Sequence, residues 1–93
     1  MRIMVTPTFH RTVKKLHQQQ KTVLDEAVRT IASQPEVGEI KVDDLAGVQV
    51  FKFRMDNLQC LLAYRLLDEN TLKLLMVGPH ENFYRDLKRS ESL

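Results

Sequence analysis

Residues 48–77 read VQVFKFRM DN LQCLLAYRLL DEN TLKLLMV, which is three largely apolar runs joined by two short polar links. Each run has the length and the branched or aromatic content that favour a β-strand. The link Asp56-Asn57 suits a two-residue hairpin turn, and links this short join antiparallel neighbours. The stretch therefore predicts an antiparallel sheet with strands over 48–55, 58–67 and 71–77.

The predicted sheet has two unlike faces, because side chains alternate along a strand and the turn at Asp56-Asn57 fixes the register. One face is almost wholly apolar and is expected to receive helices. It holds Phe51, Phe53, Met55, Leu58, Cys60, Leu62, Tyr64, Leu66, Leu72, Leu74 and Met76. The other face is expected to be open, with Val77 opposite Leu61. It carries no carboxylate but four cations, Lys52, Arg54, Arg65 and Lys73, over an apolar floor of Leu61, Leu75 and Val77.

Two amphipathic helices are predicted before the sheet, separated by the polar run at 17–20 and ended by Pro35. A strand over 2–5 precedes them, and a closing helix over 80–89 follows Gly78-Pro79. The expected fold class is α+β, with a helical hairpin on one face of a small antiparallel sheet of three to four strands. Residues 1–93 are expected to form one domain. The helical stripes are Phe9, Val13 and Leu16, then Leu24, Ala27, Val28 and Ile31.

Composition excludes several function classes. The chain has 93 residues and a net charge of +2, and its single Cys60 can form no intrachain disulfide. His10 and His17 are seven positions apart, which is too far for a helical metal pair, and no nucleotide-binding or hydrolase motif is present, so no metal or cofactor is expected. The longest apolar run, at 60–64, is too short to span a membrane, and we expect a cytoplasmic protein.

The cationic face permits two interpretations. Lysine and arginine often cover a solvated sheet face and prevent aggregation there. Alternatively, Lys52 and Arg54 suit a phosphate group, and His80 suits acid or base chemistry near neutral pH. Glu81 and Tyr84 lie within about one helical turn of His80. Either could orient His80 or exchange protons with it, and Tyr84 could also stack a base. His80 could equally stand at a helix start without any catalytic duty.

The order and spacing of the segments resemble the RelE/ParE superfamily of bacterial type II toxin–antitoxin toxins over nearly the whole chain. The resemblance implies the RelE/ParE-like fold, a toxin that inhibits growth, and a cognate antitoxin as partner. It rests on TPTFHRTVKKL (6–16), DLAG (44–47) followed by VFKFR (50–54), LAYR (62–65) and GPHENFY (78–84).

The resemblance leaves the target open. RelE-like members cut mRNA on the ribosome with basic sheet residues and a C-terminal arginine, histidine or tyrosine, whereas ParE-like members inhibit DNA gyrase. This chain has Leu61 where many relatives have arginine. Cleavage of mRNA in the ribosomal A site, gyrase inhibition and harmless RNA binding all remain hypotheses. For a nuclease, the resemblance implies catalysis by His80, Tyr84 and Glu81, and RNA or phosphate binding by Lys52, Arg54, Arg65 and Lys73.

Overall fold

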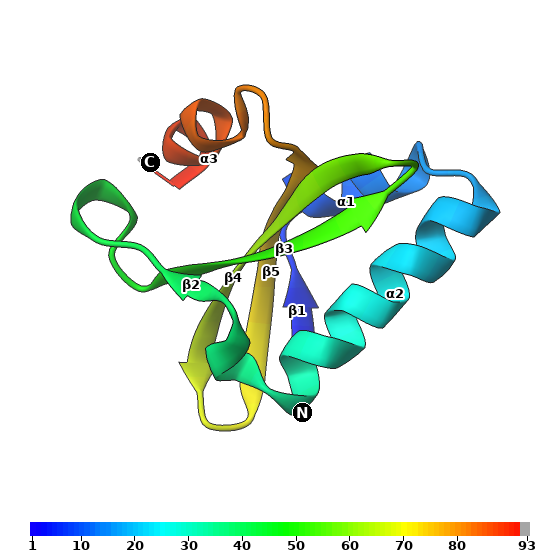
Figure 1. Ribbon diagram of the computed structural model, residues 1–93. Helices are drawn as coiled ribbons and strands as arrows, with labels where there is room; N and C mark the ends of the chain where they lie inside the picture. Colours follow the sequence, from blue (N-terminus) through cyan, green and yellow to red (C-terminus); the bar gives the residue numbers. More distant parts are fainter. Residues whose placement is uncertain (92–93) are drawn as a thin grey trace.

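A computed structural model describes residues 1–91, which form three α-helices and a five-stranded sheet (Figure 1). The strand order is β1-β5-β4-β3-β2, with β1 parallel to β5 and the other neighbours antiparallel. The elements are β1 (Arg2–Val5), α1 (Pro7–Lys14), α2 (Gln18–Ser33), β2 (Glu39–Ile40), β3 (Val48–Met55), β4 (Leu58–Asp68), β5 (Thr71–Pro79) and α3 (Phe83–Glu91), with 3₁₀ turns at Pro35–Val37 and Asp43–Leu45.

The predicted α+β class is confirmed, but the predicted strand count was too low. Strand β1 pairs with the outer edge of β5, a parallel contact between distant residues that local periodicity does not reveal. Strand β2 has only two residues and lies between Pro35 and β3, where the sequence predicted no strand. Helix α3 begins at Phe83 and not at His80, because Asn82 has a left-handed backbone (φ 62°) that a helix does not contain.

The β3–β4 hairpin has the predicted register, with Phe51 opposite Leu62 and Phe53 opposite Cys60. Asp56 and Asn57 both adopt positive φ, at 54° and 62°, as a type I′ turn requires. Because this turn matches the twist of its strands, the local sequence was sufficient to set the pairing.

The β4–β5 pairing has two register shifts, one beside the turn between Leu66 and Asp68, and one further along at a bulge in β5. Ala63 pairs with Met76 but Tyr64 pairs with Leu74, so Leu75 is an extra residue in β5. As a result, Val77 packs with the helical hairpin and Met76 packs on the opposite face, which reverses both predictions. The expected partner of Leu61 was also wrong, since Leu61 pairs with Gly78 and not with Val77.

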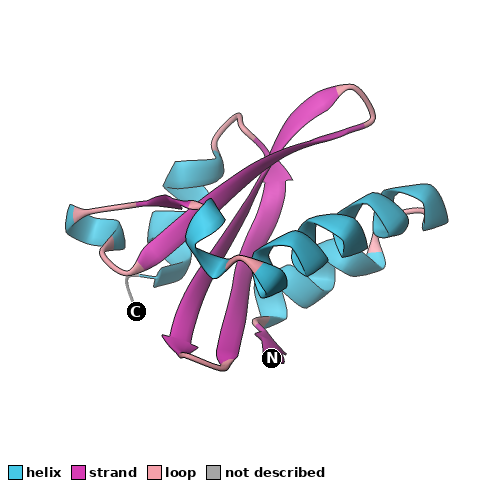
Figure 2. Ribbon diagram, turned by 60° about the horizontal axis from the view of Figure 1, so that its bottom comes forward, coloured by secondary structure: helices cyan, strands magenta, loops and turns pink. Residues whose placement is uncertain are grey.

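The helical hairpin docks on the predicted apolar face (Figure 2). Its start is fixed by Thr6, whose hydroxyl accepts a hydrogen bond from the Phe9 N–H at 3.0 Å and donates one to the Leu75 carbonyl at 2.7 Å. The buried cluster formed here contains Phe9, Leu24, Ala27, Ile31, Leu62, Tyr64, Leu72, Leu74 and Val77.

The second face of the sheet is covered and not open, which corrects the sequence prediction. Helix α3 lies on this face, opposite the hairpin (Figures 1 and 2), and buries Phe83 and Leu87 against it. Leu61 and Leu75, expected as an exposed floor, are 0% and 1% exposed. An amphipathic helix must bury its apolar stripe, and this apolar floor is the surface it uses. The exposed part of the face is thereby reduced to the region beside α3.

The described residues lack two features, a membrane-spanning helix and a cluster of metal-binding side chains. Their helices are too short or too polar to cross a membrane. Nor do three or more His, Cys, Asp or Glu side chains of residues 1–91 gather where they could hold a metal ion. Cys60 is buried in β4, and burial raises the pKa of its thiol, as expected for a structural cysteine.

Candidate functional site

Tyr64 of β4 fixes the first half of the connection between α2 and β3. Its side chain is fully buried, and its hydroxyl donates to the Pro35 carbonyl at 2.6 Å and accepts from the Gly38 N–H at 3.0 Å. A Cβ atom at Gly38 would lie 2.5 Å from the Tyr64 hydroxyl oxygen, so only glycine fits there. Burial raises the pKa of Tyr64 and keeps this donor protonated.

Arg65 fixes the second half of the same connection. Its Nη1 donates to the Ala46 carbonyl at 3.0 Å, and its Nε and Nη2 each lie 3.0 Å from the Glu91 Oε1. The neighbouring Gly47 has φ 87°, and a Cβ atom on it would lie 2.7 Å from the Arg65 Nη1. Arg65, predicted to bind phosphate, is therefore engaged in holding α3 and the connection.

The structure also divides the four predicted sheet cations between two places. Arg65 pairs with Lys73 on one side and with Val48 on the other, so both cations lie near the start of β3. Lys52 and Arg54 lie four and six residues further along that strand. The expectation that this face lacks a carboxylate was wrong, because Glu91 at the end of α3 reaches Arg65.

Lys52 and Arg54 form the exposed cationic pair of β3. They point to the same side of the strand and, with Phe53 and Gln59, line a shallow depression of about 260 Å³. Arg54 donates to the Asn57 carbonyl at 3.1 Å. Within residues 1–91, the Lys52 ammonium has neither a hydrogen bond nor an ion pair. These two charges are available to an anionic ligand.

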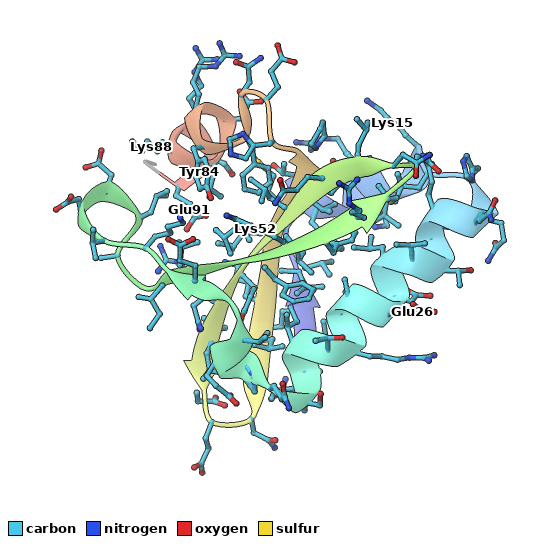
Figure 3. The ribbon with its side chains drawn as sticks, in the orientation of Figure 1. Lys15, Glu26, Lys52, Tyr84, Lys88 and Glu91 are labelled. Carbon is cyan, nitrogen blue, oxygen red and sulfur yellow. The ribbon has the colours of Figure 1, made fainter. Side chains whose placement is uncertain are left out.

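His80 and Tyr84 are brought together at the start of α3. The chain reaches them from Gly78, which is aligned through Leu61 with Lys52 across the sheet. The two rings are 6.0 Å apart in an edge-on arrangement, and the Tyr84 ring also meets the edge of the buried Phe83 ring at 5.6 Å. Figure 3 shows Tyr84 on α3 and Lys52 on β3, the two elements that frame this region.

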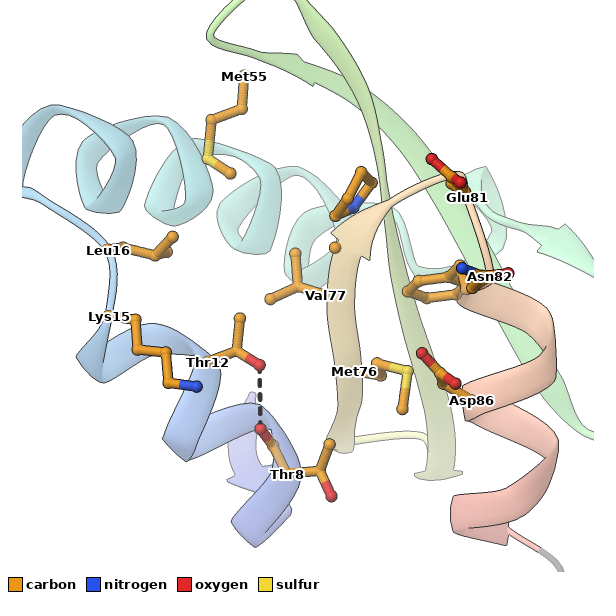
Figure 4. Close-up of a pocket in the computed structure, with 13 residues that line it drawn as sticks. Thr8, Thr12, Lys15, Leu16, Met55, Met76, Val77, Glu81, Asn82 and Asp86 are labelled. Carbon is orange, nitrogen blue, oxygen red and sulfur yellow. Dashed lines mark hydrogen bonds between the residues drawn. The ribbon is translucent and has the colours of Figure 1, made fainter.

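Glu81 has a different setting from His80 and Tyr84. It lines a groove of about 560 Å³ between α1, the end of β5 and α3 (Figure 4). Lys15, Met55 and Asp86 line the same groove. In the described part of the chain, neither a hydrogen bond nor an ion pair joins the side chains of Glu81 and His80, so Glu81 has no polar link to the other two predicted catalytic residues.

Lys41 belongs to this region and was not identified from the sequence. Its Nζ lies 4.9 Å from the centre of the Tyr84 ring and 3.3 Å from the Glu39 Oε2. Burial pushes the pKa of Lys41 down, but the Tyr84 hydroxyl and the Glu39 carboxylate outweigh burial, and the net pKa lies above its ordinary value. A lone lysine outside the predicted helices and strands gives no signal that it meets a tyrosine of the closing helix.

Comparison with solved structures identifies the fold. A mutant of the E. coli toxin RelE in the free state superposes with a TM-score of 0.73 and 14% identity, covering 98% of this chain and 93% of that chain. A chain of the intact E. coli RelBE toxin–antitoxin complex gives 0.69 and 17%, covering 86% and 96%. A chain of the RelBE2 toxin–antitoxin complex from Mycobacterium tuberculosis gives 0.59 and 27%, covering 85% and 96%.

Comparison with protein families identifies the relatives of the sequence. No curated protein matches it. The family model described as the ParE-like toxin of type II bacterial toxin–antitoxin systems matches residues 3–88, nearly the whole chain. Together with the RelE-like fold, this match shows that the chain belongs to the ParE-like toxins of type II bacterial toxin–antitoxin systems.

Proposed function

We propose that this toxin inhibits growth as a ribosome-dependent endoribonuclease that cuts mRNA in the ribosomal A site. The observation that carries the proposal is the position of the cations Lys52 and Arg54, which no carboxylate neutralises in the described residues. They lie at the end of the sheet where β5 delivers His80 and Tyr84. The solved relatives that share the fold include RelE toxins.

The chemistry needs no metal. A base removes the proton from a ribose 2′-hydroxyl, the resulting oxygen attacks the adjacent phosphorus, and an acid protonates the departing 5′-oxygen. In the proposed site Lys52 and Arg54 stabilise the extra negative charge on the phosphate. His80 exchanges the proton, and Tyr84 holds the neighbouring base or assists His80.

The other predicted residues receive secondary parts in this proposal. Glu81 faces the groove beside α1, so we assign it a supporting role at the edge of the site and no direct contact with His80. Lys73 would meet RNA beyond the cleaved phosphate, since it lies at the far end of the sheet. Arg65 is partnered by Glu91 and Ala46 and acts through the fold.

Gyrase inhibition is the second candidate function, and one observation favours it. Position 61 carries a buried leucine and no cation, and Arg65 is paired with Glu91. Fewer cations are therefore available around Lys52 than the sequence suggested. An induction experiment with two parallel readouts decides between the candidates. If the toxin is a nuclease, we expect cleaved mRNA in cells and unchanged supercoiling by purified gyrase. Full toxicity with intact mRNA and blocked supercoiling would establish gyrase inhibition as the function instead.

We also propose a cognate antitoxin as the partner, since two relatives of the same fold are solved in complexes with antitoxins. The outer edge of β1 supports a protein partner. Ile3, Met4 and Val5 are 41%, 46% and 49% exposed there, and an unpaired apolar edge readily accepts an added strand. An acidic antitoxin segment would complement Lys52, Arg54 or Arg85. Co-purification with the product of the adjacent reading frame tests this partner, and a tagged toxin recovered alone would contradict it.

A further inference from the structure

The connection between α2 and β3 carries a lysine into the proposed site from outside the central sheet. The Lys41 N–H donates to the Val48 carbonyl at 2.9 Å, which fixes its backbone against the start of β3. Tyr64 and Arg65 hold the connection on either side of it. Lys41 is therefore placed by a rigid frame.

The Lys41 side chain and the His80 ring both approach the ring of Tyr84. The Lys41 Nζ lies 4.9 Å from the ring centre of Tyr84, and the His80 ring lies 6.0 Å from the same centre. The side chain of Lys41 is only 22% exposed, so its charge acts in a partly dehydrated setting. Tyr84 thus has an imidazole and an ammonium group among its neighbours.

The ammonium group of Lys41 can exchange its present ion-pair partner for another anion. Its present partner, Glu39, has a 60% exposed side chain, and an ion pair of this kind contributes little free energy. Contacts with Tyr84 and Glu39 also hold the pKa of Lys41 above its ordinary value, so the ammonium stays protonated at neutral pH. A phosphate could replace the Glu39 carboxylate without a change in protonation.

The surrounding groove limits where an anion could bind. It has a volume of about 380 Å³, and its lining includes Lys41, Lys88 and Tyr84 together with the carboxylates of Asp43 and Asp44. The carboxylates repel an anion from the outer turn. The favourable position is therefore beside Tyr84, where Lys41 contacts the ring.

We propose that Lys41 is a further RNA-contacting residue, which binds the phosphate of a nucleotide next to the one held by Lys52 and Arg54 while the intervening base stacks on Tyr84. This inference rests on the proposed nuclease function. A positively charged track with an interposed aromatic ring is the arrangement that binds single-stranded nucleic acid.

The test measures cleavage of mRNA on programmed ribosomes, as the toxin concentration for half-maximal rate and the rate at saturation, over a range of salt concentrations. Lys41→Met should raise the half-maximal concentration about five- to tenfold and leave the saturating rate within about twofold. It should also make the salt dependence shallower, because one phosphate contact is lost. Lys41→Arg should restore the wild-type values, and Glu39→Gln should lower the half-maximal concentration.

Lys15→Met is the matched control, because it removes the same charge from an exposed lysine in the groove beside α1. It should leave both parameters unchanged. The inference is overturned if Lys41→Met matches wild type, if it changes only the saturating rate, or if Lys15→Met has an equal effect. If the wild-type toxin itself leaves mRNA intact, the proposed nuclease function fails, and the inference fails with it.

Discussion

Two cationic regions of one sheet face differ in the groups that surround their charges. At one end Arg65 is bound to the Ala46 carbonyl and the Glu91 carboxylate. At the other end Lys52 and Arg54 lie in a shallow depression without a carboxylate partner in the described residues. Both regions look alike in sequence, as basic residues within largely apolar predicted strands. The difference shows that a cation's role depends on the groups that the rest of the chain brings to it.

The region around Arg65, which we call the anchor, consists of Gly38, Gly47, Tyr64, Arg65 and Glu91. Each aromatic or basic side chain of the anchor approaches a glycine, at distances that exclude a Cβ atom. Three of its hydrogen bonds involve backbone groups of the connection at 35–47. The anchor thus holds Lys41, while its contact with Glu91 holds the end of the helix that carries Tyr84.

The largest expected effect separates the two regions by activity. His80→Ala should lower mRNA cleavage at least about a hundredfold, because it removes the proposed acid or base. Its stability should stay near that of the wild type, since the side chain is exposed. Single-turnover cleavage on ribosomes and urea unfolding measure the two quantities. Unchanged cleavage by a folded His80→Ala protein would remove His80 from the site.

The next effect tests the anchor by stability. Tyr64→Phe should lower the free energy of unfolding by about 1–3 kcal/mol, because the buried Gly38 N–H loses its acceptor. Gly38→Ala should destabilise the protein by a similar amount through its clash with Tyr64. In the double variant the closest contact, with the hydroxyl oxygen, is removed while the ring carbon Cε1 at 2.9 Å stays, so the clash is partly relieved and the two effects should fall short of additive. Strict additivity in urea unfolding would contradict the contact.

A smaller effect is expected for the ion pair of the anchor. Glu91→Gln should cost about 1 kcal/mol of unfolding free energy, since the amide keeps one hydrogen bond to Arg65 but loses the charge. Added salt should narrow the difference between this variant and the wild type. Cleavage by the folded fraction should not change, and a loss of cleavage without a loss of stability would place Glu91 in the site.

The smallest effect concerns alkaline pH. The folded pKa of Tyr64 is raised by burial above its ordinary value of 10.0. The unfolded chain therefore releases this proton first, and the stability that it contributes is present below about pH 10 and is lost as pH rises further. Unfolding measured from pH 8 to 11 should show a shallower decline for Tyr64→Phe than for the wild type. Equal slopes would show that Tyr64 does not titrate differently in the two states.

The sequence was sufficient where the pattern was local. The β3–β4 register follows from alternation and from the turn at Asp56-Asn57. The bulge at Leu75 was not predictable, because residues 72–77 are nearly all apolar and either register buries them. The closing helix was predicted, but the sheet face on which α3 docks was not. Lys41 was missed since its contact with Tyr84 depends on the connection that Tyr64 and Arg65 hold in place.

The most direct test of the comparison exchanges one residue from each region. Lys52→Met and Arg65→Met remove one positive charge each from the same sheet face, and cleavage per folded molecule is measured together with urea unfolding. The structure predicts that Lys52→Met loses cleavage about tenfold or more with little change in stability. Arg65→Met should lose about 1–3 kcal/mol of unfolding free energy and retain cleavage per folded molecule. The reverse pattern, or equal losses of cleavage in both variants, would contradict the division of the face into an anchor and a site.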